Sequence, residues 1–278
     1  MGYITLKDNR KYYFNNTKIM GIINSTPDSF YEGSRTYNSE IAIGKAIKMI
    51  EEGASFIDVG GESTRPGSMP INLEEEVKRV IPVIEGIRRV SKDILISIDT
   101  YRSIVAQEAI KAGADIINDI SAMTFDENMA TIACKYSVPI ILMHIKGTPK
   151  NMQKNPFYNN VIKEVTTFFE ERISYALSKG IGKDRIILDP GIGFGKLYEH
   201  NIELIKNIDE FQKLNMPILL GASRKSCIGT AIEMASPQER LEGTIAVTCY
   251  ATLKGVEIIR VHDVLENRKA AMMIEVLK

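Results

Sequence analysis

The sequence predicts an α/β protein, a (β/α)₈ barrel of the TIM type with a short β-hairpin at its amino terminus. Short apolar runs of the kind that form buried strands recur eight times, and segments with helical spacing of apolar residues separate them. Glycine stands where four of these helices should end, at Gly53, Gly113, Gly180 and Gly255. Strands that alternate with helices form parallel sheets, and eight such units in 278 residues fit a closed barrel.

An open doubly wound sheet is the alternative for an alternating pattern of this kind. The GxGxxG fingerprint that opens a dinucleotide-binding domain follows none of the early strands. The glycines at 191, 193 and 195 lack that spacing and come late in the chain. The closed barrel is therefore favoured, as a single domain over residues 1–278, and no fused second enzyme is expected.

The elements can be placed in order from these signals. Residues 3–18 alternate apolar and polar side chains about a turn at Asp8 and Asn9, which predicts a hairpin that covers one end of the domain. Ser39 is expected to cap the first helix and Gly53 to end it. The strands are expected at residues 19–23, 56–59, 95–98, 116–117, 140–143, 186–188, 218–220 and 256–259. The later helices are expected near 73–90, before Gly113, near 127–136, 158–179 and 199–214, before Gly255, and at the end of the chain.

Composition excludes several classes of function. The 35 basic and 35 acidic residues cancel, so neither a nucleic acid nor a membrane surface is an expected partner. Cys134, Cys227 and Cys249 are odd in number and widely spaced, which argues against a disulfide framework and a structural zinc site. The amino terminus lacks the apolar core of a signal peptide, and no apolar run approaches membrane length. A cytoplasmic location is expected.

Polar or charged side chains follow every predicted strand. In a barrel, the carboxyl ends of the strands meet at one face, where active sites are built. Helix capping explains an acid or amide at such a place but not a lysine, arginine or histidine. We therefore predict an active site on this face. The residues in question are Asn24, Glu62, Ser63, Thr64, Arg65, Asp99, Asn118, Asp119, His144, Asp189, Ser223, Arg224, Lys225, Ser226, Arg260 and His262.

The last two strands carry the cations of this face. Lys225, Arg260 and His262 follow strands that neighbour the first strand in a closed barrel, and that corner of barrels often binds phosphate. Asn24, at the end of the first strand, supplies an amide oxygen of the hard type that Mg²⁺ accepts. A phosphorylated ligand is the prediction.

The middle strands end in residues that suit a flat, nitrogen-rich ring. Asp99, Asn118 and Asp189 can each accept or donate a hydrogen bond to such a ring. The loops at 25–38 and 62–72 are rich in Gly, Ser, Thr and Pro and could close over it. No serine or cysteine has an obvious base beside it in sequence, so stabilisation of a leaving group fits better than covalent catalysis.

Nine segments then occur in a recognisable order. They are IMGIINSTPDSF (19–30), DVGGESTRPG (58–67), ISIDT (96–100), IINDIS (116–121), ILMH (141–144), LDPGIGFGK (188–196), LLGASRKS (219–226), LEGTIA (241–246) and RVHDV (260–264). In these segments, and over nearly its whole length, the sequence resembles the dihydropteroate synthases of the pterin-binding barrel superfamily.

The resemblance implies a transferase of folate biosynthesis. Such an enzyme condenses 6-hydroxymethyl-7,8-dihydropterin pyrophosphate with p-aminobenzoate to 7,8-dihydropteroate and pyrophosphate. It also implies Mg²⁺ as cofactor, sensitivity to sulfonamides and a homodimer. The dimer rests on the resemblance, because the apolar residues near the end of the chain equally suit packing onto the barrel. These are Ala270, Met272, Met273 and Val276.

The resemblance also implies a role for each matching residue. The pterin site would comprise Asp99, Asn118, Met143, Asp189, Lys225 and Arg260. The p-aminobenzoate site would comprise Thr64, Arg65, Pro66, Phe194 and Ser226, with Ser226 on the carboxylate. Pyrophosphate would be bound by Asn24 (through Mg²⁺), Arg260 and His262. The residues that carry catalysis would be Asp99, Asp189, Lys225, Arg260 and His262. In the loop at 191–195, Gly191 and Gly193 would give the ring clearance.

Cys227 departs from the family pattern. Members often carry a bulkier apolar residue such as Phe or Met at this place, directly after the SRKS segment. We expect a packing change beside the p-aminobenzoate site, which could alter the response to sulfonamides.

Two alternative functions use the same barrel. A methyltetrahydrofolate-dependent methyltransferase would account for Asp99, Asn118 and Asp189 but not for the basic ends of the last two strands or the TRPG loop. A non-catalytic pterin-binding protein would leave Asn24 and the cations unexplained. Release of pyrophosphate that depends on p-aminobenzoate separates the three functions.

Overall fold

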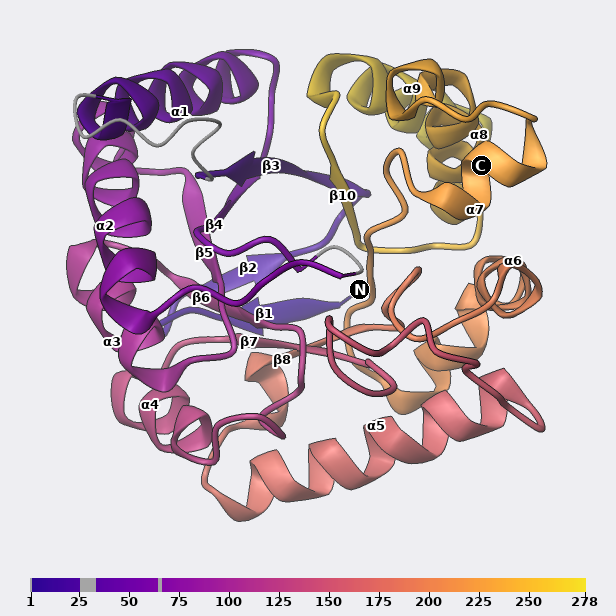
Figure 1. The fold of residues 1–278 in the computed structure, drawn as a ribbon, viewed down its shortest axis with the longest axis horizontal. Helices are drawn as coiled ribbons and strands as arrows, with labels where there is room; N and C mark the ends of the chain where they lie inside the picture. The colour runs from indigo at the N-terminus through magenta and orange to yellow at the C-terminus, as the bar shows by residue number, and fades with distance from the viewer. Residues whose placement is uncertain (1, 26–33, 65–66) are drawn as a thin grey trace.

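The computed structural model describes residues 2–25, 34–64 and 67–278, and side chains in the second range from residue 39. In this part of the chain, eight parallel strands form a barrel, and helices surround it (Figure 1). The barrel strands are β3 (Lys18–Asn24), β4 (Phe56–Gly60), β5 (Leu95–Asp99), β6 (Ile116–Asp119), β7 (Ile140–Met143), β8 (Ile186–Asp189), β9 (Leu219–Leu220) and β10 (Ile258–Val261).

The strands are paired in the order β8-β7-β6-β5-β4-β3-β10-β9. A single bridge from Leu188 to Ile218 joins the two ends of this sheet, so the ring closes between β8 and β9. Every pairing in the ring is parallel, as the strand–helix alternation requires. The predicted barrel is confirmed.

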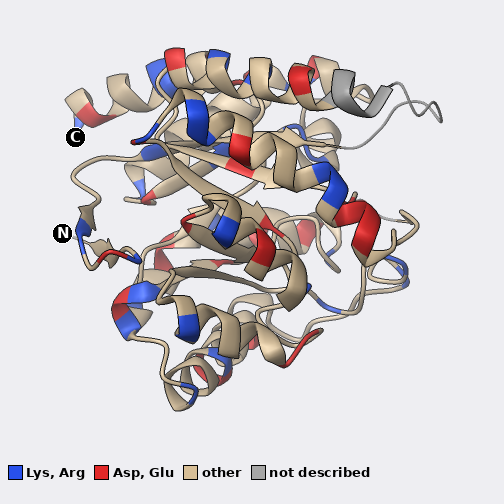
Figure 2. Ribbon diagram, turned by 90° about the vertical axis from the view of Figure 1, so that its left-hand side faces the viewer, with Lys and Arg blue, Asp and Glu red and all other residues tan. Residues whose placement is uncertain are grey.

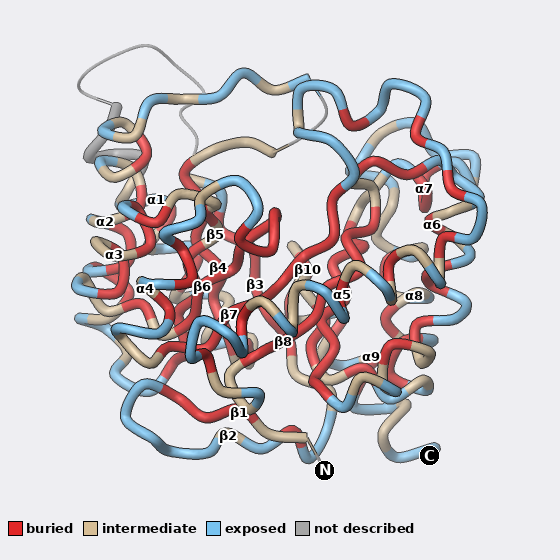
Figure 3. Tube along the Cα trace, turned by 90° about the horizontal axis from the view of Figure 1, so that it is seen from below, coloured by how far each residue is buried: buried red, intermediate tan, exposed pale blue. Residues whose placement is uncertain are grey.

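Each barrel strand contributes one apolar side chain to a cluster at one end of the interior, which we call the barrel floor. Its members are Met20, Phe56, Leu95, Ile116, Ile141, Ile187, Leu219 and Ile258, none more than 6% exposed. The hairpin of β1 (Tyr3–Thr5) and β2 (Lys11–Tyr13) adds Ile4, Leu6 and Phe14 to the same cluster. Figure 3 shows β1 and β2 at the lower end of the barrel. The hairpin prediction is confirmed, including its place over one end of the domain.

Polar contacts fix the hairpin to the barrel floor. Arg185 donates to the carbonyl oxygens of Thr5 at 2.9 Å and Leu6 at 2.8 Å. Lys7 donates to the carbonyl oxygen of Ala114 at 2.9 Å. These bonds pair backbone groups that would otherwise be left against an apolar surface.

The outward-facing residues of the strands pack against the helices in the main hydrophobic core. Strand residues are buried on both faces, which explains their nearly continuous apolar runs. Figure 3 shows the buried strands at the centre and exposed segments on the outer helices. The helices are α1 (Ser34–Glu51), α2 (Leu73–Val90), α3 (Ser103–Ala112), α4 (Asn128–Tyr136), α5 (Val161–Ser178), α6 (Tyr198–Lys206), α7 (Ser226–Ala231), α8 (Leu241–Leu253) and α9 (Val264–Leu277). Short 3-10 helices lie at η1 (Lys183–Arg185), η2 (Ile208–Leu214) and η3 (Pro237–Glu239).

Two predicted helix boundaries are wrong. Ser39 lies inside α1 and does not cap it, since the preceding sequence SRTYN contains neither the proline nor the glycine that would stop a helix. The helix expected at 199–214 is divided at Asn207 into α6 and η2. The Asn207 side chain donates to the Glu203 carbonyl at 2.9 Å, which competes with continuation of the helix.

The last strand begins two residues later than predicted. Residues before it complete the end of α8, where Gly255 has a φ of +80° and the Val256 amide donates to the Ala251 carbonyl. Glu257 accepts from the Ile218 amide at 2.8 Å. As a result, Arg260 lies inside β10 rather than after it.

Charges of both signs are interspersed along the outer helices (Figure 2). Within the described part of the chain, no helix has the length and apolar character needed to cross a bilayer.

Candidate active site

A polar layer lies directly above the barrel floor. Side chains alternate along a strand, so the residue two positions after a floor residue also points into the barrel. On five strands this residue is polar, and we call this set the polar layer. Its members are Asp58, Ser97, Asn118, Asp189 and Arg260.

Asp58 is the centre of this layer. It is 0% exposed and accepts a hydrogen bond from Arg260 Nε at 2.6 Å, from Asn118 Nδ2 at 3.1 Å, and from the Ser97 hydroxyl. The sequence prediction missed Asp58, because that reasoning considered only residues at the ends of strands. A carboxylate in the middle of the apolar run FIDVG was the available signal.

Arg260 joins two carboxylates across the interior. Its Nε contacts Asp58, and its Nη2 donates to Asp99 Oδ2 at 2.8 Å. Burial alone would lower the pKa of Arg260, but Asp58 and Asp99 outweigh it and raise the pKa above its usual value. Burial, together with the charge of Asp58, raises the pKa of Asp99 to about 7, while Arg260 opposes this shift.

The side-chain oxygen of Asn118 is a buried acceptor without a hydrogen-bond donor among the described residues. Its Nδ2 is paired with Asp58, but its buried Oδ1 accepts no hydrogen bond from any residue that the structure describes. Asn118 lies beside Asp99 in the register of β5 and β6. A buried acceptor without a donor is costly in a finished core, so this oxygen indicates a ligand with an N–H group.

Asp189, Lys225 and Phe194 form the opposite side of the interior. Asp189 accepts from the Gly191 amide at 2.8 Å, and burial raises the pKa of Asp189 while Lys225 opposes the shift. Lys225 donates to the Ile192 carbonyl, and its Nζ lies 4.6 Å from the centre of the Phe194 ring. Burial lowers the pKa of Lys225 to about 8, against the charge of Asp189.

The rim near β10 and β3 carries the remaining predicted residues. His262 is the first residue after β10, and its Nδ1 is 2.9 Å from Ser223 Oγ. Asn24 is exposed at the end of β3, opposite Gly60 in the register. Arg224 is not part of the site, because it forms two 2.8 Å bonds to Asp263 that anchor its own loop.

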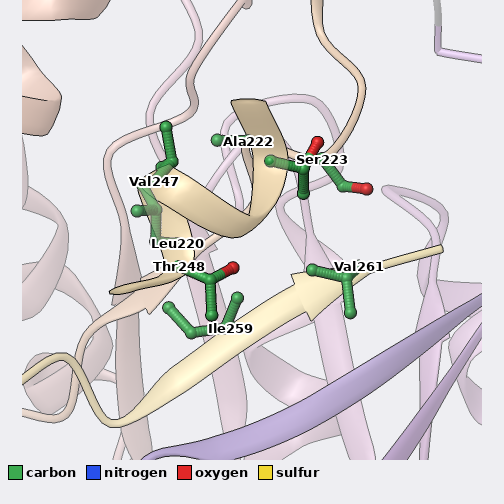
Figure 4. Close-up of a pocket in the computed structure, with 8 residues that line it drawn as sticks. Leu220, Ala222, Ser223, Val247, Thr248, Ile259 and Val261 are labelled. Atoms are coloured by element: carbon green, nitrogen blue, oxygen red, sulfur yellow. The ribbon is translucent and has the colours of Figure 1, made fainter. Parts of the chain in front are cut away.

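A small cavity lies behind Ser223, between β9, β10 and α8 (Figure 4). Its volume is about 10 Å³, which suits a single water molecule and excludes an organic ligand. The residues that line it are Leu220, Ala222, Ser223, Thr244, Val247, Thr248, Ile259 and Val261.

The structure describes three of the five residues predicted to bind p-aminobenzoate. Phe194 is half-buried and packs against the small cluster that contains Met143. Ser226 is exposed as the first residue of α7, and Thr64 is half-buried in the loop after β4. Arg65 and Pro66 lie outside the described residues, as does much of the loop at 25–38.

The base of the loop at 62–72 is held by charge. Glu62 pairs with Arg102 at 2.8 Å and accepts from the Tyr101 hydroxyl at 2.8 Å. Farther along, the Gly67 amide donates to the Pro149 carbonyl at 3.2 Å. The loop that contains Pro149, between β7 and α5, therefore contacts this loop, although the sequence prediction did not include it in the site.

Two of the predicted residues at strand ends, Asp119 and His144, stabilise loops of the barrel rather than face the site. Asp119 is buried and accepts from the amides of Ser121 at 2.8 Å and Met123 at 2.7 Å, so it shapes the turn after β6. His144 Nδ1 lies 2.8 Å from Lys196 Nζ behind the loop at 191–195. Burial, with the nearby charge of Lys196, lowers the pKa of His144 well below its usual value.

Gly191 serves a different purpose from the ligand clearance predicted for it, and Gly195 shares that purpose. Gly191 has a φ of +66°, and a Cβ there would lie 2.0 Å from the His144 carbonyl oxygen. A Cβ on Gly195 would lie 2.3 Å from the Lys146 carbonyl oxygen. At Gly193 the nearest atom to such a Cβ is Lys225 Cδ, at 3.3 Å. Gly191 and Gly195 thus make room for the neighbouring loop's backbone rather than for a ligand.

Comparison with known proteins gives a consistent answer. The pterin binding enzyme family matches residues 20–262. The dihydropteroate synthase of Synechocystis sp. is 46% identical over 248 residues, which cover 89% of this chain and 86% of that protein.

Solved structures agree with the sequence match. The dihydropteroate synthase of Yersinia pestis, determined with a sulfonamide drug complex, has a TM-score of 0.92 and 38% identity, with 99% and 98% of the two chains covered. The dihydropteroate synthase of Xanthomonas albilineans with 4-aminobenzoic acid has a TM-score of 0.91 and 36% identity, with 99% and 97% covered.

Removal of the Asp58 charge tests the polar layer. In Asp58→Asn, Arg260 loses one of its two buried counter-charges, and we expect the free energy of unfolding to fall by about 3–5 kcal/mol. Thermal and urea unfolding measure this loss. The matched control is Asp8→Asn, which removes an exposed partner of Arg10 and should leave the unfolding midpoint nearly unchanged. Equal midpoints for the two variants would contradict a central role for Asp58.

Proposed function

Because this chain belongs to the dihydropteroate synthase family of pterin binding enzymes, we propose that its barrel mouth seats a pterin ring in the polar layer and an arylamine and a pyrophosphate above it. The chain is a transferase of folate biosynthesis. It condenses 6-hydroxymethyl-7,8-dihydropterin pyrophosphate with p-aminobenzoate, and the products are 7,8-dihydropteroate and pyrophosphate.

The unpartnered Oδ1 of Asn118 is the observation that carries the pterin assignment. A dihydropterin presents N–H groups along its ring edges and one carbonyl oxygen. The carboxylates of Asp99 and Asp189 can accept from such N–H groups together with Asn118, and Lys225 can donate to the carbonyl oxygen. Met143, buried beside Asp189 in the register of β7 and β8, would line the slot.

The reaction follows from this placement. The bond between the pterin methylene carbon and the pyrophosphate oxygen breaks, and its electron pair leaves with pyrophosphate. The electron-rich ring and the nearby carboxylates of Asp99 and Asp189 stabilise the positive charge left on the methylene group. The arylamine nitrogen then bonds to that carbon and loses a proton. Arg260 and His262 would offset the charge that grows on pyrophosphate.

Asn24 is the residue proposed to hold Mg²⁺. The described residues contain no group of three or more His, Cys, Asp or Glu side chains that could hold a metal ion. Mg²⁺ binds in many sites through one or two protein oxygens, substrate phosphates and water, and the exposed amide oxygen of Asn24 fits that pattern. When bound, Mg²⁺ would neutralise part of the charge on the departing pyrophosphate.

The p-aminobenzoate would lie between Phe194 and Ser226. The Phe194 ring offers an apolar face, and the exposed Ser226 hydroxyl at the start of α7 can donate to the carboxylate. Thr64 would bound the site from the loop after β4, with Arg65 and Pro66 next to it in sequence. Cys227 is buried behind Ser226, and burial raises the pKa of its thiol, so it acts as packing rather than as a nucleophile.

The final helix supports the proposed homodimer. Met272, Met273 and Val276 do not pack onto the barrel, since they are 52%, 54% and 80% exposed. Leu253, at the end of the adjacent α8, is also exposed. Apolar side chains gathered on neighbouring helices favour a contact between two copies.

Three free cysteines support the proposed cytoplasmic location. Cys134, Cys227 and Cys249 form no disulfide, and thiols stay reduced in the cytoplasm.

The function is tested by following pyrophosphate release from the pterin substrate. We expect release that requires p-aminobenzoate, stops when EDTA removes the metal and returns when Mg²⁺ is added in excess, because the leaving group needs its charge neutralised. Assays without the arylamine are the control. A methyltransferase or a non-catalytic binder on this barrel would release no pyrophosphate under any of these conditions.

Asp189→Asn tests the ring site. Loss of the carboxylate removes a charge-assisted hydrogen bond worth about 1.5–3 kcal/mol, so the dissociation constant for the pterin should rise about 10- to 100-fold. The fold should survive, because the side chain keeps its shape, and thermal unfolding checks this. Asp209→Asn on the surface is the control. Turnover and pterin affinity equal to wild type would exclude Asp189 from the ring site.

The pH profile reports two groups of the site. As pH falls through about 7, Asp99 takes up a proton and loses the charge that stabilises the methylene cation. As pH rises through about 8, Lys225 loses the proton that it donates to the ring. We therefore expect a bell-shaped dependence of kcat/KM for the pterin substrate on pH. In Lys225→Arg the alkaline limb should move to higher pH, because arginine stays protonated. An alkaline limb that stays near 8 in Lys225→Arg would rule out this assignment.

A further inference from the structure

Each of the five carbonyl oxygens at residues 191–195 accepts a hydrogen bond from a side chain. The pairs are Lys196 with Gly191 at 2.9 Å and with Phe194 at 3.0 Å, Lys225 with Ile192, Gln153 with Gly193 at 2.6 Å, and Tyr158 with Gly195 at 2.9 Å. Loops usually leave such carbonyl groups to water. Complete pairing by side chains, two of the bonds from the adjoining Lys196 and three from other parts of the chain, makes this segment a fixed wall of the site.

Lys196 makes two of these five bonds from a buried position. Its side chain is 3% exposed, and its Nζ also lies 2.8 Å from His144 Nδ1 and 3.3 Å from the His144 carbonyl oxygen. No carboxylate among the described residues forms an ion pair with it. Burial lowers the pKa of Lys196 well below its usual value. Burying an amine without an ion pair costs hydration free energy. The bonds of Lys196 to the carbonyl groups of this loop therefore indicate that it holds the loop in position.

Asp189 and Phe194 are held in different ways, although they lie five residues apart. Asp189 belongs to β8, where it pairs with Met143, and its carbonyl accepts from the His144 amide at 3.0 Å. Phe194 lies beyond the strand. Its carbonyl oxygen accepts from Lys196 Nζ, its amide donates to the Gly191 carbonyl oxygen at 3.1 Å, and these two bonds fix its backbone. Loss of Lys196 would therefore move Phe194 much more than Asp189.

We propose that Lys196 is a positioning residue for the arylamine, which acts by fixing the Phe194 ring from behind. This inference rests on the proposed role of Phe194 in the p-aminobenzoate site. Lys196 touches neither substrate. It ties the turn at 191–194 to His144, so the Phe194 ring keeps one place beside Lys225.

Lys196→Met tests the inference, because methionine keeps the length and apolar stem but cannot donate. We expect KM for p-aminobenzoate to rise at least about tenfold, since small misplacement of a contact surface is costly. The dissociation constant for the pterin, measured by equilibrium titration, should change less than about threefold, in keeping with the register that holds Asp189. A purely structural role would lower the amount of active enzyme without this split.

Three companion variants make the result decisive. Lys7→Met removes a lysine that also donates to a backbone carbonyl, but at the barrel floor, and should leave both constants unchanged. Gln153→Ala removes an exposed donor to the same wall, so it should fold and raise KM for p-aminobenzoate in the same direction, even if Lys196→Met does not fold. Phe194→Leu should raise KM for p-aminobenzoate directly.

The outcomes separate this inference from the proposed function. Suppose that Phe194→Leu raises KM for p-aminobenzoate and that Lys196→Met folds. If this KM is then unchanged in both Lys196→Met and Gln153→Ala, the positioning role is overturned. If Lys196→Met does not fold, an unchanged KM in Gln153→Ala overturns it. If Phe194→Leu itself has no effect, the proposed place of p-aminobenzoate is wrong and the inference falls with it.

Discussion

A guanidinium held between two carboxylates inside the barrel, one fully buried and one largely buried, organises its interior. Asp58 and Asp99 come from adjacent strands, and both would repel in a space that excludes water. Arg260 contacts both of them from β10, which offsets this repulsion and links three strands across the interior. A buried ion pair of this kind adds little net stability compared with an apolar core. It leaves instead a charged layer, with an unpartnered amide oxygen, in the place where a ligand can reach it.

The two sides of the polar layer are built on different principles. On the Asp58 side, strand register places each group, and the hydrogen bonds run between neighbouring or facing strands. On the Asp189 side, a loop carries Phe194, and its carbonyl groups are fixed by Lys196 of the same loop and by side chains from two other segments, the β7–α5 loop and the residue before α7. Lysines contact this loop from both sides, Lys225 from within the site and Lys196 from behind. Rigid support of a site residue by groups that never touch the ligand is a general requirement of precise binding.

Sequence patterns predicted the barrel, the hairpin and most strands, because apolar periodicity and the glycines that end helices are local signals. They also predicted which strand ends converge, since parallel strands in a barrel all point the same way. They failed where a residue's meaning depends on distant partners. Asp58 lies within a strand, and only the fold shows that Arg260 and Asn118 face it. Lys196 was visible as part of the GFGK segment, yet its burial against His144 depends on how two loops pack. Gly191 was assigned to ligand clearance because the sequence does not show that the His144 backbone lies against it.

The closed floor of the barrel has a consequence for the order of events. Eight strand residues and the hairpin block the lower end, so traffic can pass only through the mouth. If the pterin occupies the polar layer and the arylamine lies above it, as proposed, the deeper ligand has to arrive first and the shallower one covers its path out. Pyrophosphate, nearest the rim, has the shortest way out and can depart before the joined product. Because the interior is open at one end only, the proposed placement of the ligands would impose an order of binding and release on the reaction.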